Sequence, residues 1–282
     1  MTDTKNTAQV PTFSCDGGHM PVIGFGTFQI EGDDCRKAVK MALESGYRHI
    51  DTARMYKNEK EVGQGIKDAP VSREDIFLTT KLQMGELDPA GVRTSCENSL
   101  RDLDTDYLNL LLIHWPETSV PLTDTLGAMA KLKKEGKIRH IGVSNFTVAW
   151  MNEAVNATSE HIFCNQIEYH PYLNQDPPID VCQQHGTGIV AYSPLARGKV
   201  LQDRTLAEIG RKYGKNPAQV ALRWLIEQKD VIAIPKGSSP DHIRSNFDIF
   251  DFSLDAEDFA SIQQRQTNGR LIDPDFAPKW DT

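Results

Sequence analysis

The sequence has few cysteines and no long apolar run, and both absences limit the kind of protein it can be. The 282-residue chain contains five cysteines, an odd number, and no Cys-x-x-Cys pair. A disulfide-stapled domain is therefore excluded, and we expect reduced thiols in a cytoplasmic protein. The longest apolar stretch, residues 108–113, is too short to cross a bilayer. Residues 1–10 are polar and lack the apolar segment of an export signal, so we expect neither export nor a membrane partner.

The chain also lacks an excess of positive charge. It has 31 lysines and arginines against 39 aspartates and glutamates, which gives a net charge of −8. This balance argues against nucleic acid as a partner, although a local basic patch can still bind a phosphate. Apolar residues make up 39% of the sequence, which is enough for a core and excludes a disordered or collagen-like chain.

Motifs of several common enzyme classes are missing. The sequence contains no Gly-x-Ser-x-Gly and no His-Glu-x-x-His, and its eight histidines show no metal-ligand spacing. These absences argue against a serine hydrolase and a zinc enzyme, and we predict no metal site. Gly24-x-Gly26 lacks the third glycine of a Rossmann turn, so a dinucleotide would have to bind in another way.

The sequence does contain a regular alternation of strand-like and helix-like segments. Eight short β-rich runs lie at residues 22–25, 47–50, 76–80, 108–113, 138–143, 162–167, 188–192 and 231–234. The segments between them have helical periodicity or a helix-favouring composition. Eight strands that each lead into a helix favour an α/β fold, a closed (β/α)8 TIM barrel.

Two further segments complete the predicted fold. Asp16-Gly17, between short runs with Phe13 and Met20, predicts an N-terminal β-hairpin. The tail, residues 266–282, is expected to form a C-terminal substrate loop. No Pro- or Ser-rich linker divides the chain, so we predict one domain over residues 1–282, with residues 1–10 as a flexible polar leader.

Polar residues recur at the ends of the predicted strands. They are Thr27, Asp51, Lys81, His114, Ser144, Asn145, Gln166, Ser193 and Lys236. From residue 27 to residue 235 the chain takes seven steps of roughly 30 residues each, the size of one βα unit. Because the carboxyl ends of barrel strands form one rim, we expect these side chains to face a common site.

Three of these rim positions, Asp51, Lys81 and His114, suggest a chemistry together with Tyr56, which lies in the loop after Asp51. A phenol has a pKa of about 10 and is a poor acid near neutral pH, but a nearby ammonium lowers that pKa. Lys81 can supply the cation, and Asp51 can keep it charged and oriented. A neutral His114 can donate a hydrogen bond to a carbonyl oxygen. The set suits protonation of an oxygen while another group attacks the adjoining carbon.

Motifs at the strand ends follow one another in a fixed order. They are Met20-Pro21-x-x-Gly24-x-Gly26-Thr27, Tyr47-Arg48-His49-Ile50-Asp51-Thr52-Ala53, Thr80-Lys81-Leu82, His114-Trp115-Pro116, Gly142-Val143-Ser144-Asn145-Phe146, Asn165-Gln166-x-Glu168-Tyr169-His170-Pro171, Ala191-Tyr192-Ser193-Pro194-Leu195 and Ile234-Pro235-Lys236-Gly237. Together they resemble the aldo-keto reductase family, and the length and the ending are most similar to its bacterial, diketogluconate-reductase-like members. The resemblance implies a barrel that reduces an aldehyde or ketone with NADPH.

The resemblance also implies roles for individual residues. Tyr56 would be the general acid, Lys81 and Asp51 would tune it, and His114 would orient the carbonyl. Phe28, Tyr56, His114 and Trp115 would line the substrate pocket. The nucleotide would be held by Gly26, Thr27, Asp51, Ser144, Asn145, Gln166, Tyr192, Ser193, Leu195, Lys236, Ser238, Ser239, His242 and Asn246.

Within the nucleotide set, the implied contacts run from one end of the cofactor to the other. Ser144, Asn145 and Gln166 would hold the nicotinamide carboxamide, and Tyr192 would stack on its ring. Lys236 and the serines after it would take the 2′-phosphate, with Asn246 at the adenine. Ser239-Pro240 also predicts the start of a helix, which is a ready anion site.

The chain departs from the family pattern near the expected phosphate site. His242 stands where many relatives have an arginine, and Gly237 stands where serine is common. Arg244 lies on a different helix face by the 3.6-residue period, so it does not replace that arginine automatically. NADPH is the expected cofactor, and use of NADH stays open. Gln83-Met84 follow Leu82 where close relatives often have tryptophan, which puts the shape of the substrate pocket in doubt.

The sequence is compatible with two functions. The first is a monomeric enzyme that reduces a small carbonyl compound, such as a dicarbonyl or a sugar-derived keto acid. The second is a non-catalytic NADP(H)-binding protein that acts as a redox-sensing or regulatory subunit. The intact set of Asp51, Tyr56, Lys81 and His114 favours the enzyme, because a sensor needs nucleotide affinity but no tuned phenol.

Overall fold

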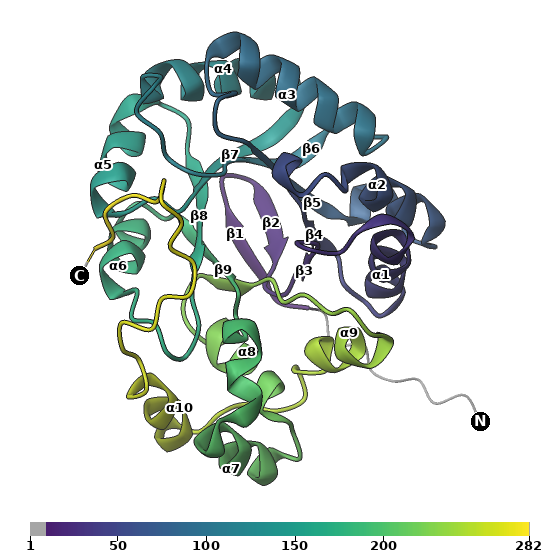
Figure 1. Cartoon of the computed structure of the whole chain (residues 1–282), viewed down its shortest axis with the longest axis vertical. Helices are drawn as coiled ribbons and strands as arrows, with labels where there is room; N and C mark the ends of the chain where they lie inside the picture. Colours follow the sequence, from purple (N-terminus) through teal and green to yellow (C-terminus); the bar gives the residue numbers. More distant parts are fainter. Residues whose placement is uncertain (1–9, 282) are drawn as a thin grey trace.

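Eight parallel strands form the centre of the molecule (Figure 1). The computed structural model describes residues 10–281, so the predicted leader lies, except for residue 10, outside the described residues. The strand order is β10-β9-β8-β7-β6-β5-β4-β3. The strands are β3 (Phe25–Gly26), β4 (His49–Asp51), β5 (Phe77–Leu82), β6 (Leu108–Ile113), β7 (Ile138–Ser144), β8 (Ile162–Glu168), β9 (Gly188–Tyr192) and β10 (Val231–Ala233).

Hydrogen bonds beside the first and last strands close the sheet. The Gly24 amide donates to the carbonyl oxygen of Ala233 at 2.8 Å, and the Ala233 amide donates to that of Val22 at 2.9 Å. Ile23 forms a parallel bridge with Ala233, so the run at 22–25 closes the barrel although only Phe25–Gly26 of β3 pairs with β4. The predicted α/β barrel is therefore confirmed.

The predicted hairpin is also present. It consists of β1 (Thr12–Cys15) and β2 (Gly18–Pro21), paired antiparallel. The turn residues Asp16 and Gly17 have φ of 45° and 72°. A turn with positive φ at both positions has a twist that matches the twist of the paired strands. Aspartate followed by glycine adopts such a turn readily, which explains the pair.

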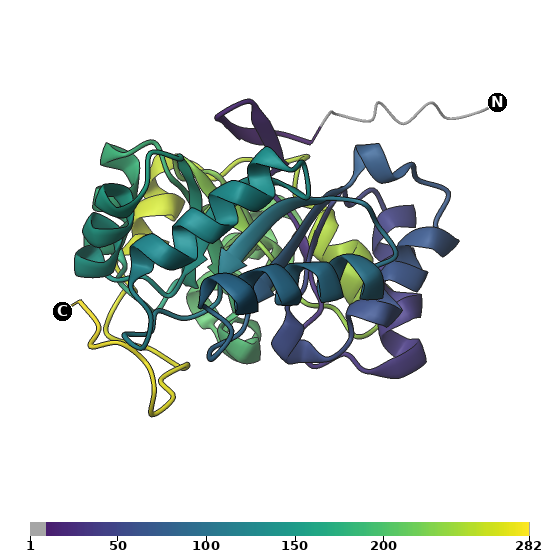
Figure 2. The same ribbon diagram turned by 90° about the horizontal axis from the view of Figure 1, so that it is seen from above.

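The hairpin closes the amino-terminal end of the barrel. Phe13 and Met20 join an inner apolar cluster, and the Phe13 ring packs edge-on against Phe163 with 5.5 Å between centroids. The hairpin and the C-terminal tail lie on opposite sides of the molecule (Figure 2). The carboxyl ends of the strands are therefore the accessible end.

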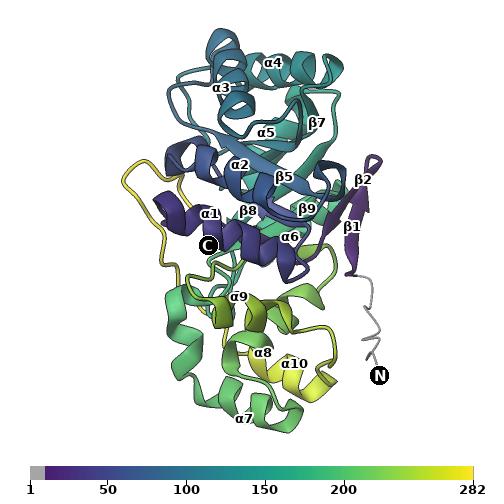
Figure 3. The ribbon, with the colours of Figure 1, turned by 90° about the vertical axis from the view of Figure 1, so that its right-hand side faces the viewer.

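Helices cover the outside of the barrel (Figure 3). Those of the repeating units are α1 (Gly32–Glu44), α2 (Glu59–Asp68), α3 (Pro89–Asp102), α4 (Leu122–Lys134), α5 (Val148–Ala157), α6 (Asp176–Gln184), α8 (Pro217–Ile226) and α9 (Pro240–Phe247), with short 3-10 turns η1 (Arg54–Tyr56), η2 (Arg73–Asp75) and η3 (Ala196–Gln202). The face of α1 with Cys35, Val39 and Leu43 is buried, as its period indicates. At the start of α8, Asn216 and Gln219 form a capping box.

Two helices were not predicted as separate elements. α7 (Arg204–Tyr213) lies between β9 and α8, and α10 (Ala256–Gln263) packs against α7 near the end of the chain. The Asp203 side chain caps α7 by accepting from the Leu206 amide at 3.1 Å. The barrel therefore has an added helical layer outside α8.

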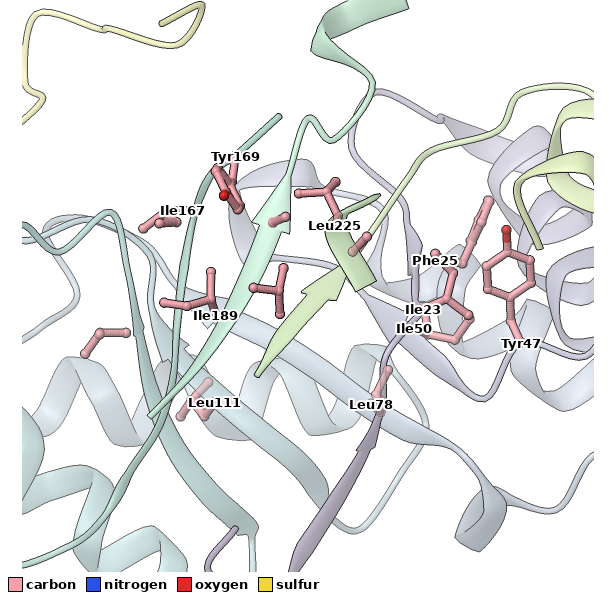
Figure 4. Close-up of a cluster of buried hydrophobic side chains, with 14 of the residues drawn as sticks. Ile23, Phe25, Tyr47, Ile50, Leu78, Leu111, Ile167, Tyr169, Ile189 and Leu225 are labelled. Atoms are coloured by element: carbon pink, nitrogen blue, oxygen red, sulfur yellow. The ribbon is translucent and has the colours of Figure 1, made fainter. Parts of the chain in front are cut away.

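Most of the apolar core lies between the strands and the helices (Figure 4). Ile50 and Leu78 are fully buried there, and burial of such a side chain contributes about 1.5–3 kcal/mol. Trp224 and Leu225 on α8 are also fully buried. Within residues 10–281, no helix has both the length and the apolar character to span a bilayer.

Candidate active site

A cavity of about 780 Å³ opens at the carboxyl ends of the strands. It brings together most of the predicted site residues from around the barrel: Gly26, Thr27, Phe28, Asp51, Tyr56, His114, Trp115, Ser144, Asn145, Gln166, Tyr192, Ser193, Leu195 and Lys236. Lys81 does not line it but lies fully buried behind Tyr56, within hydrogen-bond distance of the phenol. The predicted common site therefore exists.

Lys81 is a buried ammonium at the end of β5. Its Nζ donates to Asp51 Oδ1 at 2.5 Å and to the carbonyl oxygen of Thr52 at 2.8 Å. It lies 3.3 Å from the Tyr56 hydroxyl. Burial alone would lower the pKa of Lys81, but the Asp51 carboxylate and Tyr56 raise it above its ordinary value. Lys81 is therefore charged, as predicted.

The pKa of Tyr56 differs from the prediction. Burial raises it, and the Lys81 ammonium offsets only part of that increase. The predicted proximity is confirmed, but the predicted net lowering of the pKa is wrong, because the sequence does not show how much water the phenol loses. Tyr56 therefore stays protonated across neutral pH, which is the form that donates a proton.

A polar network holds the turn that contains Tyr56. Arg54, at the start of η1, donates to Glu59 at 2.7 Å and to Asp102 at 2.8 Å. The other oxygen of the buried Glu59 carboxylate accepts from Thr80 at 2.6 Å. Thr80 precedes Lys81 on β5, so Glu59 links the turn with the phenol to the strand with the ammonium.

His114 is a neutral imidazole at the wall of the cavity. Burial and the Lys81 charge lower the pKa of His114 well below 6.5. The ring lies edge-on to Tyr56, with 5.8 Å between centroids. Its Nδ1 has no hydrogen-bond partner among the described residues. The predicted neutral form is confirmed, and a neutral ring can donate one hydrogen bond into the cavity.

Amide and hydroxyl side chains line another part of the cavity wall. Gln166 Nε2 donates to Asp51 Oδ2 at 2.7 Å, and Ser144 Oγ donates to the Gln166 carbonyl oxygen at 2.8 Å. The Tyr192 hydroxyl donates to Asn145 Oδ1 at 2.8 Å. Asn145 has φ of 61°, in the left-handed region that asparagine tolerates. Gln166 Oε1 has no partner within residues 10–281, so it remains available to a ligand amide.

Of the predicted phosphate and adenine residues, which lie just before α9 and within it, one borders the cavity. Lys236 lines it, is exposed, and forms no ion pair in the part of the chain that the structure describes. Ser239 caps α9 by accepting from the His242 amide at 3.2 Å, so the predicted helix start is confirmed. Ser238, Ser239, His242 and Asn246 do not line the cavity itself. Asn246 is buried and donates to the Lys236 carbonyl oxygen at 3.5 Å.

Packing explains one departure from the family pattern. A Cβ added to Gly237 would lie 2.8 Å from Ile243 Cγ1 and 3.0 Å from its amide nitrogen. A serine there would therefore require α9 to move. Arg244 faces Asp241 at 3.8 Å on the exposed side of α9. The lysine and arginine side chains that line the cavity in the described chain are thus Lys236, ahead of α9, and Arg197, in η3.

The outer wall of the cavity is mostly apolar. Phe28 and Trp115 line it as predicted, and the Phe28 ring lies 4.9 Å from that of Tyr56. Met55, Arg197 and the tail residues Leu271, Ile272, Asp273, Pro274 and Phe276 also line it and were not predicted individually. Met55 precedes Tyr56, so its position in the motif was a usable signal. The tail has no periodic pattern that could have singled out its residues.

Known proteins give an independent comparison. The model of the aldo/keto reductase family matches residues 22–266. The chain is 40% identical over 266 residues to methylglyoxal reductase DkgB of Escherichia coli O157:H7, covering 93% of this chain and 99% of that protein.

Solved structures agree in fold. A protein provisionally described as a 2,5-diketo-D-gluconic acid reductase B is 41% identical, with a TM-score of 0.95 over 97% of this chain and 98% of that one. The aldo-keto reductase of Bombyx mori, solved in complex with NADP, is 36% identical, with a TM-score of 0.87 over 94% and 95% of the two chains. The closed barrel, the rim residues and these matches together show that the chain belongs to the aldo/keto reductase family and is an oxidoreductase.

Proposed function

We propose that the chain reduces an aldehyde or ketone to the alcohol with NADPH, and that Tyr56 is the general acid. One observation supports this most directly. The Tyr56 hydroxyl faces the cavity 3.3 Å from a buried ammonium that Asp51 holds at 2.5 Å. A protonated phenol next to a fixed cation can give up its proton when an oxygen nearby becomes negative.

The side chains act in a defined order. NADPH, when bound, supplies the hydride to the carbonyl carbon. Tyr56 and His114 donate hydrogen bonds to the carbonyl oxygen, and Tyr56 transfers its proton as negative charge develops there. Lys81 stabilises the phenolate that remains, and Asp51 keeps Lys81 charged.

The residues present fit a nicotinamide dinucleotide. Ser144, Asn145 and Gln166 would hold the carboxamide, for which Gln166 Oε1 is still available. Tyr192 would lie against the nicotinamide ring, and Ser193 and Leu195 would line the pyrophosphate. Lys236, with Ser238, Ser239 and the start of α9, would receive the 2′-phosphate, whereas His242 would contribute less than an arginine and Asn246 would lie near the adenine. Gly26 and Thr27 would border the same groove. The free cation at Lys236 supports NADPH over NADH.

A small dicarbonyl is the substrate class that the site supports best. Phe28, Trp115 and Phe276 make the outer wall largely apolar, which suits a small uncharged dicarbonyl, whereas the one cation named on this wall, Arg197, is the partner that the carboxylate of a keto acid would need. The name of the relative DkgB, a methylglyoxal reductase, points in the same direction. A sugar-derived keto acid remains the second candidate for the assay.

The test is the loss of NADPH absorbance with a panel of small dicarbonyls and keto acids. We expect turnover with the dicarbonyls. Tight NADPH binding without turnover of any carbonyl would instead support the non-catalytic redox-sensing subunit. That the enzyme is a single-domain monomer of the cytoplasm, without nucleic acid or membrane partner, stays a prediction.

A further inference from the structure

Glu168 is a buried carboxylate that the proposed mechanism does not use. It is the last residue of β8, two positions after Gln166, and its side chain is fully buried. His170 Nε2 lies 2.9 Å from Oε1, and the Arg270 guanidinium lies 3.9 Å from Oε2. A buried charge of this kind is costly unless other groups compensate it.

The remaining partners of Glu168 come from the C-terminal tail. The Leu271 amide donates to Oε1 at 2.8 Å, and the Ile272 amide donates to Oε2 at 2.9 Å. Charge-assisted bonds from backbone amides are strong and fix the position of the backbone that donates them. Residues 269–281 contain neither helix nor strand, so no ladder of their own holds them.

The stretch of the tail that Glu168 holds forms part of the cavity wall. Leu271 and Ile272 line it, and Phe276 and Trp280 pack on Trp115 with 5.3 and 6.1 Å between ring centroids. Arg270 stacks on the Trp280 ring at 3.6 Å. The two amides that donate to Glu168 therefore fix the tail at Leu271 and Ile272. Farther along the chain, contacts with Trp115 hold the tail on the substrate side of the site.

We propose that Glu168 is a positioning residue for the substrate pocket: it holds the C-terminal tail against the cavity from the strand that also contains Gln166. Glu168 does not touch the reacting atoms. It sets how well the apolar wall fits a carbonyl substrate, and it leaves the proton transfer and the nucleotide contacts unchanged. This inference rests on the proposed carbonyl reduction.

The first variant is Glu168→Gln, which keeps the size of the side chain and removes its charge. The new carboxamide would also place its own N–H donor opposite one of the two tail amides, which are donors as well. We expect KM for a carbonyl substrate to rise at least tenfold, with kcat and the Kd of NADPH within about threefold of wild type. A matched control is Glu227→Gln on α8, because Glu227 also accepts from an arginine and a backbone amide (Arg223 and Leu254) but lies outside the cavity lining. It should leave KM unchanged.

A second pair of variants tests the other end of the contact. Ile272→Pro removes the amide hydrogen, and Ile272→Ala removes the side chain but keeps that hydrogen. The proline variant should raise KM more than the alanine variant. Combined with Glu168→Gln, Ile272→Pro should raise KM little further, because both changes break the same contact.

A readout without turnover separates this inference from the proposed function. Arg270 is nearly buried in the folded tail, so trypsin should cut after it faster in Glu168→Gln than in wild type, as mass spectrometry can show. If cleavage and KM stay at wild-type values, or if kcat and NADPH affinity fall as much as KM rises, the positioning role is wrong. If no carbonyl is reduced by wild type, the proposed function fails, and the cleavage rates still decide whether Glu168 holds the tail.

Discussion

Replacement of Tyr56 by phenylalanine tests the proposed acid most directly. Within residues 10–281, the Tyr56 hydroxyl has one hydrogen bond, the 3.3 Å contact with Lys81 Nζ. Its loss should cost about 1 kcal/mol of folding free energy at most, or about 2–4 °C in Tm. Lys81 keeps its bonds to Asp51 and Thr52, so the variant should fold and bind NADPH.

The effect on the rate should be much larger than the effect on stability. A positioned general acid contributes about 10²–10⁴-fold, which corresponds to about 2.7–5.5 kcal/mol of activation free energy. His114 cannot take over the role, because its pKa lies well below 6.5 and its imidazole carries no extra proton at neutral pH. We therefore expect kcat to fall at least 10²-fold.

The assay is NADPH oxidation at saturating nucleotide, with nucleotide binding measured separately by fluorescence. Tyr107→Phe is the matched control, because Tyr107 lies just before β6 at the opposite end of the barrel and its ring faces Arg73 and Arg139. It should retain the wild-type rate. A Tyr56→Phe enzyme that binds NADPH and works within tenfold of wild type would refute the assignment of the acid.

Three further predictions concern the cofactor, the pH dependence and the fold. Lys236→Ala should weaken NADPH binding at least tenfold and NADH binding little, as titration of each nucleotide can show; equal losses would remove Lys236 from the 2′-phosphate. Because burial raises the pKa of Tyr56, the reduction rate should be flat from about pH 6 to 9 and fall only above the usual phenol range, whereas alcohol oxidation should rise with pH; a reduction rate that halves near pH 7 would contradict this. Phe13→Ala should lower the free energy of unfolding by about 3–5 kcal/mol, because it empties the end of the barrel; a loss below 1 kcal/mol in urea unfolding would show that the hairpin does not support the core.

The sequence was sufficient to predict the barrel and most of its rim. Segments in which apolar residues alternate or follow one another without a break locate the strands, and a polar residue after each segment locates the carboxyl end of the strand. His114 and Gln166 were found in this way, although they are 52 residues apart and meet only in the closed sheet. The Asp16-Gly17 turn was equally clear, because its chemistry is local.

Other features depend on the folded environment and were not accessible. The direction of the Tyr56 pKa shift depends on burial, which the position of Lys81 in the sequence does not show. The tail at residues 271–276 has no periodicity, and its path is set by the remote carboxylate of Glu168. α7 was missed because the segment after β9 holds two helices and a turn where the repeating unit predicts one helix.

Asp51 uses its two oxygens for different partners. Oδ1 accepts from Lys81, and Oδ2 accepts from Gln166, the residue proposed for the nicotinamide carboxamide. A change at Gln166 that alters how the nicotinamide is held would therefore also remove a donor from the carboxylate that pairs with Lys81. Placement of the nicotinamide and the strength of the acid thus depend on one carboxylate, and a redesign of either has to compensate the other.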